Sequence, residues 1–84
     1  MFRQEVNQIL EHLFKIVDDR NTVYKEQWRH YPPHILYCAV AYKIWRALFT
    51  PDYKARLDDL YDALAYLLFW IVNEEHRQLD NNVQ

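Results

Sequence analysis

Three aspartates stand close together near the start of a long apolar stretch of this 84-residue chain. Asp58 and Asp62 are four residues apart and Asp59 and Asp62 are three apart, so a helix would place the carboxylates on one side. Carboxylates held this close repel one another, and a hard cation such as Mg²⁺ would relieve the repulsion. The alternative is that the three aspartates form a solvated helix face, with Lys54 and Arg56 nearby to offset their charge. The spacing alone favours this alternative.

Two cations precede these aspartates. Lys43 and Arg46 are three residues apart in the stretch AYKIWR, which places both on one side of a helix. Such a pair suits phosphate oxygens, because an arginine can grip them with two parallel hydrogen bonds. The alternative is a pair of surface cations whose aliphatic stems lie along apolar neighbours, and these two residues alone favour that arrangement.

The segment DDRNTVYKEQWRHYPP, residues 18–33, is unusual for a connection between two apolar segments. It carries Asn21, Tyr24, Trp28 and Arg29, whereas an ordinary connection between helices needs only a few polar residues. Connections longer than about 12 residues are usually functional. We therefore expect this segment to form a wall of a binding pocket; the alternative is that Trp28 fills a gap beneath a long loop.

The remaining sequence predicts helices. There is no glycine, which makes tight hairpins hard to build, and apolar residues recur at helical spacing. The three prolines suit helix starts. The sequence therefore predicts a single all-α domain over residues 1–84, with three main helices at 1–20, 33–49 and 51–77, a long functional loop at 21–32 and a frayed tail at 78–84.

The stretch ALAYLLFWIV, residues 63–72, is apolar on every side of a helix. Two partner helices are too few to enclose it, so we expect a second subunit to cover it. This predicts a homodimer or homotetramer with Tyr66, Phe69 and Trp70 near the contact. Ten residues are too few to cross a bilayer, which takes about 20, so no membrane partner is expected.

Charge and cysteine content narrow the function classes. The net charge is −2 and the isoelectric point is about 6.0, which argues against nucleic-acid binding. Residues 23–56 carry +4 and residues 57–84 carry −5, so these parts are expected to lie against each other or to meet at a shared site. Cys38 is the single cysteine, and the N-terminus lacks the pattern of a signal peptide, so a cytoplasmic protein is expected.

The order of these motifs resembles the MazG-like all-α NTP pyrophosphatase superfamily, and most closely its small phage-type nucleotide-modification-associated domains. There the connection typically reads K-N-x-D-Y-G-x-x-W, the second helix D-K-x-x-R and the third D-x-x-x-D-x-x-x-Y. The similarity covers roughly residues 10–75, and the matching positions are Asn21, Tyr24, Trp28, Lys43, Arg46, Asp58, Asp62 and Tyr66.

This resemblance implies a helical bundle completed by oligomerisation, in which carboxylates on facing helices bind Mg²⁺. It also implies hydrolysis of nucleoside triphosphates to the monophosphate and pyrophosphate. The implied nucleotide-binding residues are Asn21, Tyr24, Trp28, Arg29, Lys43, Arg46 and Tyr66. The implied magnesium ligands are Asp58, Asp59 and Asp62, with Glu11 or Asp18 from the first helix.

Several positions depart from the family pattern. Val23 and Tyr42 stand where the family has acidic residues, and Lys25 stands where it has glycine. The first helix also lacks the E-x-x-E of typical catalytic members, so the metal-ligand set is incomplete. The sequence supports a nucleoside triphosphate-binding protein or a magnesium-dependent pyrophosphohydrolase. The alternative is a non-catalytic, oligomeric helical protein of phage or mobile-element origin that acts on a protein partner.

Overall fold

The computed structural model describes the backbone of residues 1–83 and the side chains of residues 1–78. Every regular element in this part of the chain is helical, which confirms the predicted all-α class. None of its helices is both long enough and apolar enough to span a membrane. In chain order the elements are α1 (Phe2–Tyr24), the 3₁₀ helix η1 (Gln27–His30), α2 (Pro33–Phe49) and α3 (Tyr53–Val83).

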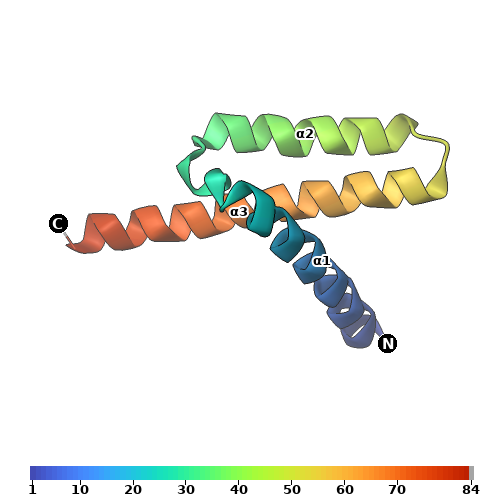
Figure 1. Cartoon of the computed structure of the whole chain (residues 1–84), viewed down its shortest axis with the longest axis horizontal. Helices are drawn as coiled ribbons and strands as arrows, with labels where there is room; N and C mark the ends of the chain where they lie inside the picture. The colour runs from blue at the N-terminus through green and yellow to red at the C-terminus, as the bar shows by residue number, and fades with distance from the viewer. Residues whose placement is uncertain (84) are drawn as a thin grey trace.

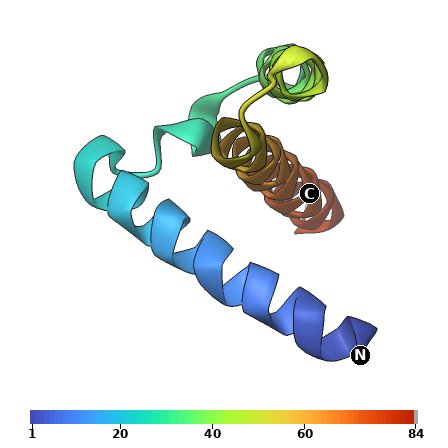
Figure 2. The same cartoon turned by 90° about the vertical axis from the view of Figure 1, so that its right-hand side faces the viewer.

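α2 lies alongside α3, as a helical hairpin, whereas α1 crosses α3 and its N-terminal half projects away (Figure 1). Seen from the side, α1 and α2 lie on opposite sides of α3 (Figure 2). The third helix is therefore the central element, to which the other segments attach.

α1 continues past its predicted end at residue 20 to Tyr24, because no glycine or proline interrupts it. It stops at Lys25 and Glu26, whose backbones are both left-handed (φ 54° and 55°). The chain then turns into η1, so most of the predicted loop over 21–32 is helical, and the long-loop prediction is wrong. Glycine is the residue that adopts this conformation at least cost, but the chain has lysine and glutamate at these two positions.

Asp52 caps α3, since its Oδ2 accepts a hydrogen bond from the amide of Ala55 (3.0 Å). The helix accordingly begins at Tyr53 rather than at the preceding proline. At its other end α3 runs past the predicted boundary to Val83, so the segment predicted to fray is helical to that point. Gln84 lies outside the described residues.

The core is small and lies where α1, η1 and α2 meet α3. Its buried members are Leu13, Leu36, Ala65 and Phe69, against which half-buried aromatic and aliphatic side chains pack. The exposed area is 6830 Å², against about 5,400 Å² for a compact monomer of 10.4 kDa. The radius of gyration is 14.4 Å, against about 12 Å for a compact chain of this length. A single copy is thus less compact than a typical small domain.

The α3 residues that were predicted near a subunit contact have partners within the chain. Phe69 is only 8% exposed, because Trp28 of η1 stacks on it. Tyr66 packs edge-on to Phe69, and Trp70 packs edge-on to Tyr37 of α2. Tyr66 and Trp70 stay half-buried, and Leu67 and Ile71 of the same apolar stretch are 42% and 46% exposed.

Candidate functional site

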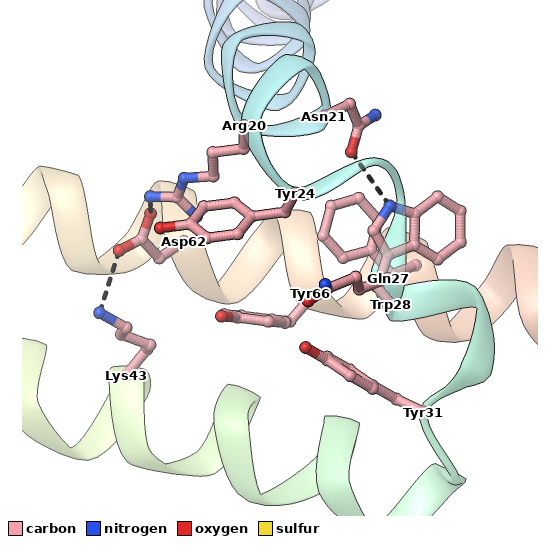
Figure 3. A pocket seen from close by; sticks show the side chains of 10 residues that line it. Arg20, Asn21, Tyr24, Gln27, Trp28, Tyr31, Lys43, Asp62 and Tyr66 are labelled. Carbon is pink, nitrogen blue, oxygen red and sulfur yellow. Dashed lines mark hydrogen bonds and ion pairs between the residues drawn. The ribbon is translucent and has the colours of Figure 1, made fainter.

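A cavity of about 400 Å³ opens between the C-terminal end of α1, η1 and the middle of α3 (Figure 3). Five of its ten lining residues are aromatic, and one acidic and two basic side chains lie at one end. The lining residues are Arg20, Asn21, Tyr24, Gln27, Trp28, Tyr31, Lys43, Asp62, Tyr66 and Phe69.

Trp28 is held from three directions. Its ring stacks on Phe69 with centroids 4.4 Å apart and planes 8° from parallel. The indole Nε1 donates a hydrogen bond to Oδ1 of Asn21 (3.2 Å). The Trp28 carbonyl accepts one from Nδ2 of Asn73 (3.0 Å), an amide that is 6% exposed. These contacts fix η1 against α3, so Trp28 forms a rigid wall of the cavity.

Asp62 joins all three long helices at the other end of the cavity. Its Oδ1 accepts a short hydrogen bond from Nη2 of Arg20 on α1. Its Oδ2 lies 3.0 Å from Nζ of Lys43 on α2 (Figure 3). Two cations therefore share one carboxylate, and this end of the cavity has a net positive charge.

Asp59 lies one turn before Asp62 and is 1% exposed. Arg46 pairs with it through both oxygens: Nε donates to Oδ2 (3.0 Å), and Nη2 lies 2.9 Å from Oδ1 without hydrogen-bond geometry. Lys43 Nζ lies 3.9 Å from Oδ1. The hydrogen bond with Asp59 raises the pKa of Arg46 above its ordinary value, so this guanidinium stays charged. The expectation that the basic middle and acidic last third meet is confirmed by these pairs.

The predicted magnesium ligands do not form a site. Asp59 and Asp62 are already neutralised by cations, and Asp58, one turn before Asp62, is exposed. Glu11 and Asp18 are exposed on α1. Within the described residues, no three His, Cys, Asp or Glu side chains gather as metal ligands do. A divalent cation would have to displace ammonium and guanidinium groups, so these residues do not fit Mg²⁺.

Most of the predicted nucleotide-binding residues do share one cavity: Asn21, Tyr24, Trp28, Lys43 and Tyr66. Two do not. Arg46 pairs with Asp59, and Arg29 pairs with Glu26 and lies 4.6 Å from the centre of the Trp28 ring. Arg29 instead borders a smaller hollow of about 300 Å³ with Asn73, His76 and Arg77.

Four lining residues escaped the sequence-based prediction: Arg20, Gln27, Tyr31 and Phe69. Phe69 carried a usable signal, because Asp62, Tyr66, Phe69 and Asn73 follow helical spacing and so share one face of α3. No such sequence signal exists for Arg20, because its partner Asp62 is 42 residues away in sequence.

Comparison of the chain with protein-family models, with curated proteins and with solved structures gave no match in any of the three searches. The geometry of the cavity and the motif resemblance therefore carry the functional argument.

Proposed function

We propose that the cavity binds a nucleoside triphosphate, or a related ligand with an aromatic ring and phosphates, without hydrolysing it. The observation that carries this proposal is the pairing of two cations, Arg20 and Lys43, with the single carboxylate of Asp62 beside an aromatic wall. The excess positive charge suits phosphate oxygens, and the wall suits a planar base.

The aromatic side chains offer a stacking surface. Tyr24 and Tyr66 lie between the Asp62 ion pairs and the Trp28 indole (Figure 3). A base stacked on such a ring is worth about 1–3 kcal/mol. The Tyr24 side chain is 59% exposed, which leaves its ring accessible to a base.

The cations can reach a phosphate with little rearrangement. The side chain of Arg20 is 38% exposed and that of Lys43 is 21% exposed, so each keeps donors directed towards solvent or the cavity. A phosphate at this end would accept those hydrogen bonds while Asp62 keeps the cations in place. Charge-assisted bonds of this kind are worth about 1.5–3 kcal/mol each.

Binding without turnover is favoured by the pairing of the carboxylates. A pyrophosphohydrolase of the MazG-like type would use Asp58 and Asp62, which match the family motif, on a metal. Here Asp62 holds Arg20 and Lys43, and the neighbouring Asp59 holds Arg46. The same pairs that suit phosphate binding leave no free acidic cluster for the reaction.

A thermal-shift screen against the eight common NTPs and dNTPs, with and without Mg²⁺, tests the proposal. A ligand present at 100 times its Kd stabilises the folded protein by about 2.7 kcal/mol. For a domain of this size that shifts Tm by about 10–20 °C. We expect such a shift with at least one nucleotide in the absence of metal, and no pyrophosphate release. No shift with any nucleotide at millimolar concentration would overturn the proposal, and magnesium-dependent pyrophosphate release would restore the enzymatic alternative.

A second candidate is a helical interaction protein. The large apolar surface left uncovered on α2 favours it, since soluble monomers rarely expose a continuous surface of this kind. The two candidates use different surfaces and are compatible.

A further inference from the structure

The positive charge at the phosphate end of the cavity is small. Among the described residues that line the cavity, Arg20 and Lys43 are the two cations, and Asp62 pairs with both. One turn away along α3, Asp59 is 1% exposed and pairs with Arg46. Three cations and two carboxylates leave this cluster with a single excess positive charge.

The backbone of α1 adds no positive charge to this end. Arg20, Asn21 and Tyr24 line the cavity from the last turns of α1, so the helix meets the cavity with its carboxyl end. That end of a helix carries a partial charge of about −0.5, whereas the amino end is the one that attracts phosphate. Additional negative charge on a ligand therefore finds no partner in α1 beyond the Arg20 side chain.

The number of phosphates on a ligand decides how well it matches this charge. A single phosphate group carries about −1.5 to −2 at neutral pH, and each further phosphate of a nucleotide adds negative charge. Magnesium normally offsets that charge, and one or two protein carboxylates help to hold the metal. Here Asp62 is occupied by Arg20 and Lys43. The carboxylate of Asp59 is occupied by Arg46, so a polyphosphate would lack the usual support for its metal.

The size and layout of the cavity agree with a small ligand. Its volume of about 400 Å³ is near the lower end of the range for small-molecule sites, which is about 300–1,000 Å³. The two cations lie at one end, and the Tyr24, Tyr66 and Trp28 rings lie beside and beyond them (Figure 3). One planar base and one phosphate account for the groups that the cavity presents.

We infer that the ligand of this cavity carries a single phosphate and is a nucleoside monophosphate rather than a diphosphate or triphosphate. The inference rests on the proposed function and narrows its ligand class. A triphosphate would still bind through its base and one of its phosphates. It would bind more weakly, because Arg20 and Lys43 already share Asp62 and cannot compensate the additional charge.

Isothermal titration of the wild type with the nucleoside monophosphate, diphosphate and triphosphate of each common base tests the inference, first in EDTA and then in MgCl₂. For the base that binds best, we expect the monophosphate to bind at least about tenfold more tightly than the triphosphate in both buffers. A triphosphate that binds as tightly as the monophosphate in either buffer would overturn the inference and leave the proposed function standing. No binding by any member of the series would overturn both.

An added cation in the cavity gives a second measurement. Gln27 is exposed and lines the cavity, so Gln27→Lys supplies a partner for a further phosphate without breaking an ion pair. It should improve triphosphate affinity relative to monophosphate affinity by about tenfold or more, as for one charge-assisted hydrogen bond. Thr22→Lys is the matched control, because Thr22 is exposed on α1 and does not line the cavity. It should leave the ratio within about twofold of the wild type, and the same ratio in both variants would contradict the inference.

Discussion

Arg20 at the end of α1 and Asp62 in the middle of α3 form an ion pair across 42 residues of sequence. α1 also meets α3 through the buried Leu13 and through the edge-on contact of His12 with Tyr61, so this pair is one of several contacts that set the angle at which α1 crosses α3. The same pair forms one end of the cavity. The position of α1 and the charge of the cavity therefore depend on the same carboxylate.

Replacement of Asp62 by Asn should lower the free energy of unfolding by about 1–3 kcal/mol. The carboxylate is 14% exposed. Its loss leaves the half-buried Arg20 without its carboxylate partner and leaves Lys43 with only the 3.9 Å contact to Asp59. Urea unfolding measures the change. Asp58→Asn is the matched control on an exposed side of α3 and should change stability by less than about 0.5 kcal/mol. A more stable Asp62→Asn variant would show that the carboxylates only repel one another.

Magnesium should not stabilise the protein in the absence of nucleotide. The carboxylates that would bind it are paired with Arg20, Lys43 and Arg46. We expect millimolar MgCl₂ to leave Tm unchanged beyond the shift seen with an equal ionic strength of NaCl. A specific rise with Mg²⁺ that Asp62→Asn abolishes would reinstate the metal site that the sequence predicted.

Trp28 should contribute to stability through its stack and through its indole hydrogen bond, and the two can be separated. Trp28→Ala removes both and should cost about 2–4 kcal/mol, because Phe69 loses its cover. Trp28→Phe keeps a ring on Phe69 but loses the bond to Asn21, and should cost about 1 kcal/mol from that bond. In a double-mutant cycle, Trp28→Phe and Asn21→Ala should be non-additive. Full additivity would mean that the hydrogen bond contributes nothing.

The turn after α1 should become more stable when its left-handed residue is glycine. Lys25 has φ 54°, a conformation that costs an ordinary residue about 1–2 kcal/mol and glycine almost nothing. Lys25→Gly should therefore stabilise the protein by about 0.5–1 kcal/mol in thermal unfolding. Lys15→Gly, in the middle of α1, is the control and should destabilise it by about 1 kcal/mol. Destabilisation by both changes would contradict the assigned turn.

The helices were predictable where proline or a cap marks an end. The predicted and observed bounds of α2 agree, because Pro33 suits the first helical turn and a proline follows soon after Phe49. The end of α1 was not predictable in the same way. Lys25 and Glu26 adopt left-handed backbone angles, but neither residue is a glycine. The sequence therefore contains no signal for the turn.

The cavity was predictable in part, and the failure has a physical cause. The motif positions Asn21, Trp28 and Tyr66 do line one cavity. The magnesium site was predicted from the spacing of carboxylates along the sequence. That spacing does not show which cations of α1 and α2 lie beside the carboxylates in the folded chain. Asp62 is paired with Arg20 and Lys43, which come from two other helices, so these pairs are visible only in the folded chain.

The most direct test of phosphate binding in the cavity is isothermal titration of two variants, Lys43→Met and Arg29→Met. The ligand is the nucleotide that gives the wild type its largest thermal stabilisation. Both changes remove one cation, but Lys43 lines the cavity and Arg29 does not. Loss of a charge-assisted bond should weaken binding by Lys43→Met about 10- to 150-fold, whereas Arg29→Met should bind within about twofold of the wild type. Equal affinities for the two variants, with both shown to be folded by circular dichroism, would contradict the assignment of this cavity to the phosphates.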